Sequence, residues 1–167
     1  MKKLYYCSFN IDQFGTVYTA SFNNALVFLH TDKNALIAYS NVLKAELTEN
    51  CEYNKPAVSQ LKEYFAGQRK EFSLKIEFLT GTDFQKKIWK ELSSISFGKT
   101  STYKDIARKV QHEKAIRAAG TAIGKNPVPI IIPCHRIINS NGKPGGFSLG
   151  LEKKKYLLEL ENIQIKD

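Results

Sequence analysis

The chain has 167 residues, of which 43% are hydrophobic and 25% are charged. This composition is typical of a globular protein with one domain or two small ones, and it excludes a mainly disordered chain. No apolar run approaches the roughly 18 residues of a membrane-spanning helix, and no signal-peptide stretch follows the first residues. We therefore expect a cytoplasmic protein without membrane contact, or a nuclear one if the host has a nucleus.

The first part of the chain is rich in β-prone residues. Three short runs at 4–7, 17–20 and 25–29 are separated by turn signals, which indicates an antiparallel meander. A helix is predicted over 33–48, and a second one from Lys55-Pro56 to Gly67. Apolar and polar residues then alternate over 72–78, which predicts a half-buried strand.

After Gly81 the pattern becomes mainly helical. A capping-box pattern at Thr82–Gln85 opens a helix that runs to Leu92. Two short helices, through 106–110 and over about 113–123, are joined by a tight turn and favour a helix-turn-helix, although many αα-hairpins share this pattern. A buried strand-like segment at 130–132 and a last helix over about 151–161 complete an α/β (α+β) chain.

Most of the net charge of +9 belongs to the second half. Residues 1–81 carry 9 basic and 8 acidic side chains (+1), and residues 82–167 carry 16 basic and 8 acidic side chains (+8). Such a concentration of basic charge points to a polyanion partner, although a solvated Lys-rich surface has the same composition. The contrast predicts two domains, 1–81 and 82–167.

The cysteines do not form a recognisable framework. Cys7, Cys51 and Cys134 are odd in number and widely spaced, so disulfide bonding is not expected. A four-cysteine zinc site is excluded by the count, and Cys7 and His30 alone cannot hold zinc tightly. We expect no metal and no cofactor.

The segment Pro133-Cys134-His135-Arg136 contains the residues best suited to chemistry. A thiol needs a nearby base or positive charge to become a nucleophilic thiolate, and His135 and Arg136 supply both. Pro133 suits a fixed turn that presents the cysteine at a cleft. The alternative is a buried cysteine at a strand end with two basic surface residues beside it.

Residues 126–137 read Asn-Pro-Val-Pro-Ile-Ile-Ile-Pro-Cys-His-Arg-Ile. This segment resembles the signature of the O6-alkylguanine-DNA alkyltransferase family, and the resemblance is dense from residue 82 to about residue 161. It implies an RNase-H-like α/β domain followed by a winged helix-turn-helix domain. It also implies a monomer that irreversibly takes the alkyl group from O6-alkylguanine in double-stranded DNA onto Cys134, once per molecule.

The resemblance implies roles for four residues around this nucleophile. His135 resembles the base that acts through a water, and Glu161 resembles the carboxylate that orients it. Asn126 resembles the residue that holds the turn, and Tyr103 the phenol that donates to the guanine ring. In such an arrangement we expect the pKa of the Cys134 thiol to lie below the roughly 8.5 of a free cysteine.

Chemistry on a base inside a duplex requires that the base be flipped out. Arg117 resembles the arginine that fills the vacated space in the stack. The other residues that the resemblance implies for substrate or DNA binding are Thr102, Ala118, Gly120, Arg136, Phe147 and Ser148. Phe147 stands where the family usually has tyrosine, so an aromatic wall is kept and a hydroxyl contact is lost.

Ordinary structural roles remain open for several of these residues. Arg117 can contact phosphate, Tyr103 can pack against its helix, Asn126 can cap a helix, and Glu159 can replace Glu161 as the carboxylate. Two other functions also remain open. A DNA-binding regulator or lesion sensor would not need the nucleophile, and a cysteine hydrolase of small substrates would not need the basic second half.

Overall fold

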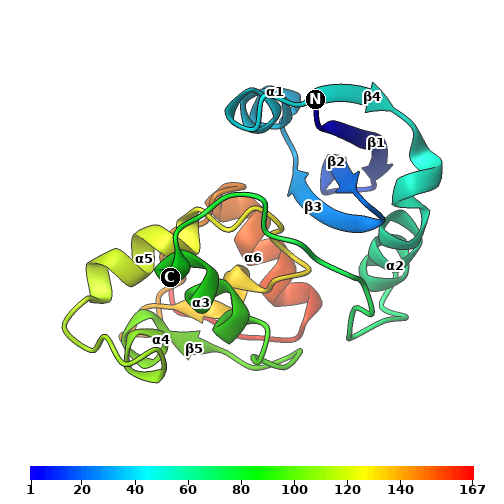
Figure 1. Cartoon of the computed structure of the whole chain (residues 1–167). Helices are drawn as coiled ribbons and strands as arrows, with labels where there is room; N and C mark the ends of the chain where they lie inside the picture. The colour runs from blue at the N-terminus through cyan, green and yellow to red at the C-terminus, as the bar shows by residue number, and fades with distance from the viewer. The chain divides into compact units, whose positions relative to one another are not determined.

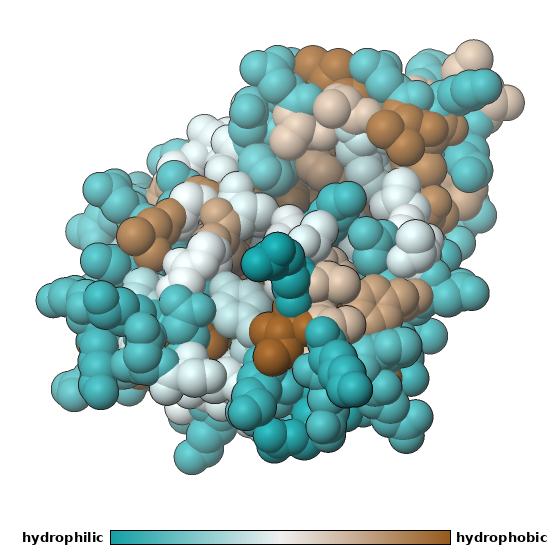
Figure 2. Space-filling view, turned by 90° about the vertical axis from the view of Figure 1, so that its left-hand side faces the viewer, coloured by the Kyte–Doolittle hydropathy of each residue, from teal (hydrophilic) through white to brown (hydrophobic).

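The computed structural model describes all residues from Met1 to Asp167, and they form two compact units, Met1–Thr80 and Gly81–Asp167 (Figure 1). Figure 2 shows one face of the molecule, on which hydrophilic side chains predominate and hydrophobic ones form separate areas. None of the helices has the length and apolar character that crossing a membrane requires.

The first unit is built on a four-stranded sheet in the order β3-β2-β1-β4. Its elements are β1 (Lys3–Ile11), β2 (Gly15–Phe22), β3 (Ala25–His30), α1 (Lys33–Val42), β4 (Glu46–Glu49), the 3-10 helix η1 (Cys51–Asn54) and α2 (Lys55–Phe65). The antiparallel meander of β1, β2 and β3 is confirmed, and β4 lies parallel to β1.

The two faces of this sheet are covered by different elements. Leu4 and Ala20 pack with Leu36 of α1 in one buried cluster. Because neighbouring residues of a strand point to opposite faces, Tyr5 and Ser21 belong to the other face. There the Ser21 hydroxyl donates to Asn54 Oδ1 of η1 at 3.0 Å. The α1 helix and η1 therefore lie on opposite faces.

Two predicted elements of this unit differ in the structure. The helix expected over 33–48 ends at Val42, because Lys44 takes a left-handed φ of 51° and residues 46–49 join the sheet as β4. Residues 72–78 keep the expected alternation of half-buried and exposed side chains, but they pair only through a single bridge between Ile76 and Leu26. Both outcomes depend on strand neighbours that are distant in sequence.

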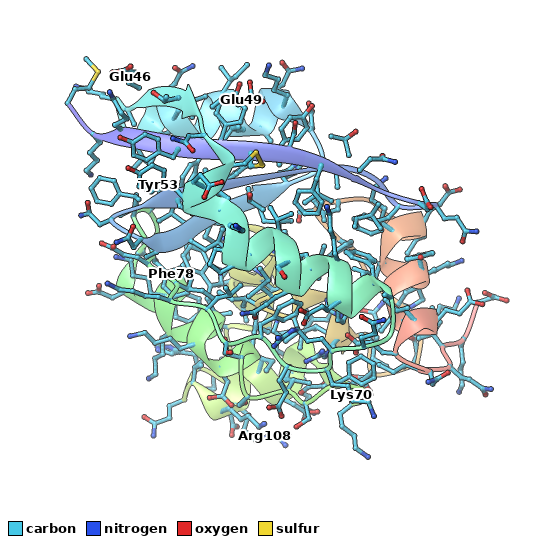
Figure 3. The ribbon with its side chains drawn as sticks, turned by 90° about the vertical axis from the view of Figure 1, so that its right-hand side faces the viewer. Glu46, Glu49, Tyr53, Lys70, Phe78 and Arg108 are labelled. Carbon is cyan, nitrogen blue, oxygen red and sulfur yellow. A yellow bond between two sulfur atoms is a disulfide. The ribbon has the colours of Figure 1, made fainter.

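Cys7 of β1 and Cys51 of η1 form a disulfide across a sequence separation of 44 residues (Figure 3). The expectation of no disulfide is therefore wrong. Spacing along the chain gave no sign of this pair, because the two residues meet only when η1 folds back onto the sheet.

The second unit is mainly helical. Its elements are α3 (Asp83–Leu92), β5 (Ser101–Thr102), α4 (Tyr103–Lys109), α5 (Ile116–Gly124), the 3-10 helix η2 (Cys134–Arg136), β6 (Ile137–Ile138) and α6 (Leu151–Leu160). The capping box of Thr82 and Gln85 at the start of α3 is confirmed. The buried Trp89 joins α3 to α5, because its Nε1 donates to the carbonyl of Ala122 at 2.8 Å.

The segment before Cys134 also differs from expectation. Residues 130–132 are buried as predicted, but they form a tight turn in which Ile130 has a φ of 76° and Ile132 N donates to Val128 O. Pro129 and Pro133 bracket this turn and lack the N–H groups that a strand would use. The turn leads directly into η2, where the candidate nucleophile lies.

Candidate active site

Asn126 holds the turn that carries Cys134. Its Nδ2 donates to Ile132 O at 2.9 Å, and its Oδ1 accepts from Val128 N at 3.0 Å. Both bonds are buried, and Cys134 N donates to the same Ile132 carbonyl at 2.8 Å. The amide thus ties both sides of the turn and fixes the backbone from which the Cys134 thiol projects.

Cys134 lines a pocket of about 290 Å³, although its own side chain is almost fully buried. The wall consists of residues from α4, α5 and the loop before α6: Tyr103, Gly120, Ile123, Gly124, Gly146, Phe147 and Ser148. Two glycines of α5 leave this wall without bulky side chains, and aromatic rings stand on other sides. This is the shape and chemistry that suit a flat, small heterocycle.

His135 and Glu161 form a fully buried pair beside the cysteine. The distance between His135 Nε2 and Glu161 Oε1 is 2.8 Å. An ionised carboxylate can only accept, so this bond assigns the imidazole proton to Nε2. The other ring nitrogen, Nδ1, is buried and has no hydrogen-bond partner in the protein. The neutral ring therefore offers Nδ1 as a proton acceptor.

Arg136, for which a binding role is expected, lies in the interior of the second unit and makes its hydrogen bonds within the protein. Its guanidinium is buried, and Nε and Nη2 donate to the Glu161 oxygens Oε2 and Oε1 at 2.8 and 2.9 Å. The third nitrogen, Nη1, donates to Ile95 O at 2.5 Å. A buried bidentate arginine is engaged in a fixed geometry and is not free to bind a ligand. Arg136 instead neutralises the carboxylate that faces His135.

Burial sets the protonation states of this group. It lowers the pKa of His135, although the Glu161 carboxylate acts in the opposite direction. It raises the pKa of the Cys134 thiol to about 11, against a hydrogen bond from Asn126 and the charge of Lys154. The expectation of a thiol pKa below 8.5 is therefore wrong, because desolvation of the thiolate outweighs the nearby basic groups.

Tyr103 faces the pocket as a protonated phenol. Burial raises its pKa, and its hydroxyl is hydrogen-bonded to the backbone of Gly146. Gly145 has a φ of 74°, and a Cβ there would lie 2.7 Å from the phenol oxygen. The positive φ and this close contact both require glycine at position 145. Because Gly145 has no side chain, the loop can approach Tyr103.

Lys154 belongs to the site and was missed from the sequence. It is fully buried in α6, and its Nζ donates to Ile137 O at 2.5 Å and to Gly146 O at 3.0 Å. Burial lowers the pKa of Lys154 to about 8. Its position on the helix stripe of Leu157 and Leu158 is the signal that could have identified it, because a lysine there must enter the core.

Of the remaining predicted residues, Gly120 and Ser148 line the pocket, and the others lie outside both the pocket wall and the buried pair. Arg117 and Ala118 are exposed on α5, and Gly120 faces Tyr103. Ser148 is an exposed part of the wall. Thr102 caps α4, because its hydroxyl accepts from Asp105 N at 3.1 Å. Glu159 is exposed, so Glu161 is the carboxylate that contacts His135.

The lowered pKa of His135 predicts a pH dependence of stability. Below a pH of about 6.5, His135 binds a proton in the unfolded protein but stays neutral in the folded protein, because its pKa is lower there. The free energy of unfolding should therefore decrease as the pH falls through that value. Thermal unfolding between pH 7.5 and pH 5 measures this decrease. The His135→Gln variant should lose part of it.

Both units match domains of known proteins. Residues 6–78 match the ribonuclease-like domain of 6-O-methylguanine DNA methyltransferase, and residues 83–163 match its DNA-binding domain. The chain is similar to the methylated-DNA–protein-cysteine methyltransferase of Methanosarcina mazei (42% identity over 84% of this chain and 85% of that protein). It is also similar to that of Methanosarcina barkeri (44% identity over 74% and 78%).

A solved structure gives the same result for the fold. The crystal structure of Mycobacterium tuberculosis OGT in complex with DNA superimposes with a TM-score of 0.79 at 34% identity, over 94% of this chain and 92% of that chain. The predicted α+β class, with a ribonuclease-like domain followed by a DNA-binding domain, is confirmed. The chain belongs to the 6-O-methylguanine DNA methyltransferase family.

Proposed function

We propose that this protein repairs O6-alkylguanine in double-stranded DNA by moving the alkyl group onto its own Cys134. The observation that carries this proposal is a buried thiol at the wall of a pocket, next to a neutral histidine whose Nδ1 is free to accept a proton. Relatives across most of the chain are named for transfer from methylated DNA to a protein cysteine.

The reaction needs a base because the thiol is protonated at rest. With a pKa of about 11, Cys134 is almost entirely a thiol at neutral pH. Its proton passes through a bridging water to His135 Nδ1, and Glu161 stabilises the resulting imidazolium from the Nε2 side. The sulfur then attacks the alkyl carbon, and the bond between that carbon and the guanine O6 breaks.

The leaving guanine receives the electron pair of the broken bond. Tyr103, whose raised pKa keeps it protonated, donates a hydrogen bond to the base and stabilises this charge until the base takes up the proton that His135 accepted from the thiol. The product is a neutral thioether on Cys134, which no group in the pocket can cleave. The protein therefore acts once, and its own residues supply the thiol, base and proton donor without a cofactor.

The number of alkyl groups accepted per chain tests this proposal. With an excess of duplex DNA that contains radiolabelled O6-methylguanine, label on the protein should saturate at one methyl group per chain. Release of product beyond one equivalent would indicate a cysteine hydrolase. Tight binding of the modified DNA without label on the protein would indicate a lesion sensor. Either of these two results would overturn the proposal.

The helix pair α4 and α5 supports binding of the duplex through its minor groove. Arg117 and Ala118 are exposed on α5, and Gly120 of the same helix lines the pocket. A flipped base could thus enter the pocket while Arg117 occupies its place in the stack. The +8 charge of residues 82–167 supplies phosphate contacts that are independent of sequence. We place this monomer where the DNA lies, in the cytoplasm or in a nucleus.

The Arg117→Ala variant should separate base extrusion from chemistry. Transfer from duplex DNA should slow by about tenfold or more, because the vacated stack is no longer filled and unstacking costs a few kcal/mol. Transfer from free O6-methylguanine should change little, since a free base needs no extrusion. Single-turnover rates on both substrates measure this, with the exposed Lys114→Ala variant as the charge control. Equal losses on both substrates would make Arg117 a pocket or folding residue.

A further inference from the structure

The disulfide of the first unit lies at a second pocket. This pocket has a volume of about 480 Å³, and its wall consists of Cys7, Ser8, Phe9, Cys51, Glu52, Lys55, Val58, Ser59 and Lys62. Cys51 is exposed, whereas Cys7 is only 3% exposed. A molecule in this pocket would therefore meet the Cys51 side of the disulfide first. Two lysines against one glutamate give the wall a positive balance.

A buried hydroxyl lies on the strand position opposite Cys7. Thr19 of β2 is fully buried, and its Oγ1 has no hydrogen-bond partner. Thr19 is directly opposite Cys7 in the antiparallel pair of β1 and β2, so both side chains lie on the same face within about 5.5 Å at Cβ. A disulfide sulfur has no proton to donate, but a thiol at Cys7 could pair with this hydroxyl.

The attachment of η1 to the sheet does not depend on the disulfide alone. Asn54 Nδ2 donates to Tyr5 O at 2.8 Å, and Asn54 Oδ1 accepts from the Ser21 hydroxyl at 3.0 Å. Asn54 is fully buried. These bonds hold η1 in place when the sulfur–sulfur bond opens, so opening can be a local event. In Figure 3 the disulfide appears as the yellow bond between the strand and the segment that leads into α2.

We propose that Cys7–Cys51 is a thiol-exchange site for small anionic thiols of the glutathione class. The incoming thiolate attacks Cys51 Sγ and forms a mixed disulfide with it. The Cys7–Cys51 bond breaks, its electron pair goes to Cys7 Sγ, and this sulfur takes up the proton that the incoming thiol released. Lys55 and Lys62 attract the anionic groups of the thiol, and Thr19 stabilises the new Cys7 thiol. The site is separate from the pocket of Cys134 and independent of the proposed repair function.

A series of small thiols tests the charge preference on the full chain. At equal thiolate concentration and low salt, 3-mercaptopropionate should open the disulfide a few-fold faster than 2-mercaptoethanol, and cysteamine should be slowest. Acid quenching, alkylation of free thiols and peptide mass measure the rate and locate the adduct. The Lys55→Gln/Lys62→Gln variant should lose the preference, and Lys44→Gln, exposed outside the pocket, should keep it. Equal rates for all three thiols, or adducts on Cys7, would overturn the proposal.

The Thr19→Val variant tests the role of the buried hydroxyl. Valine has a similar shape and removes the unpaired group, so the disulfide form should gain relative to the reduced form. In buffers of reduced and oxidised glutathione, the equilibrium should shift toward the disulfide by about tenfold. Thr16→Val, at an exposed position of the same strand, should leave the equilibrium unchanged. Thermal unfolding establishes that both variants fold, and an unchanged equilibrium in folded Thr19→Val would contradict the proposed pairing.

Discussion

The Cys134→Ser variant should take up no alkyl group from O6-methylguanine DNA. A serine hydroxyl is a far poorer nucleophile than a thiol, and a base that draws a proton from a thiol of pKa about 11 is not matched to an alcohol. The DNA-binding helices are not altered, so affinity for the modified duplex should stay within about twofold of the parent, as for a surface that loses no phosphate contact. Label uptake and equilibrium binding of the same duplex measure the two properties separately.

The Cys134→Ser variant should show no background labelling from other cysteines. The other two cysteines are joined in a disulfide and offer no thiol in a buffer without added thiols, so background labelling should be absent there. A Cys7→Ser/Cys51→Ser variant is the matched control, and it should keep full transfer because it retains Cys134. Methyl uptake on either of those two cysteines in the Cys134→Ser variant would contradict the assignment of the acceptor.

The Glu161→Gln variant should lose both activity and stability. Glutamine cannot stabilise an imidazolium by charge, so transfer should slow within the general acid–base range of roughly 10²–10⁴-fold. It also leaves the buried guanidinium of Arg136 without its countercharge, which should lower the free energy of unfolding by about 3–5 kcal/mol. Single-turnover kinetics and chemical denaturation measure the two effects.

Two further variants separate these causes. Glu159→Gln removes a carboxylate from the same helix end, but this side chain is exposed, so neither rate nor stability should change by much. Adding Arg136→Met to Glu161→Gln removes the unpaired buried charge and should restore much of the stability. Transfer should remain slow in the double variant, because His135 still lacks its carboxylate. If the double variant regains full transfer, Glu161 acts on the fold alone.

Local sequence patterns predicted the elements whose formation depends on neighbouring residues. The capping box at Thr82 and the turn residues between the first strands correspond to the structure, because their hydrogen bonds close within a few positions. The parallel strand β4 and the disulfide could not be seen in this way. Each joins residues more than 40 positions apart, and only the folded sheet brings those residues together.

The site residues show the same contrast between local patterns and long-range packing. A run of adjacent residues identified Cys134 and His135 as candidates, and the resemblance supplied Glu161. The sequence could not show that the Arg136 side chain is buried and hydrogen-bonded to Glu161, or that Lys154 is buried in the core, since both depend on packing. It also misjudged the pKa of the thiol. Basic neighbours suggested a lowered value, whereas complete burial raises it.

Peptide mass after reaction with O6-methylguanine DNA tests the central claim most directly. The parent protein is incubated with one equivalent of the modified duplex, digested, and compared with a sample that was incubated with unmodified DNA. The account predicts a gain of one methylene on the peptide that contains Cys134, on no other peptide, together with restored guanine in the DNA. A methyl group on any other residue, or bound modified DNA with no change in the mass of the protein, would contradict it.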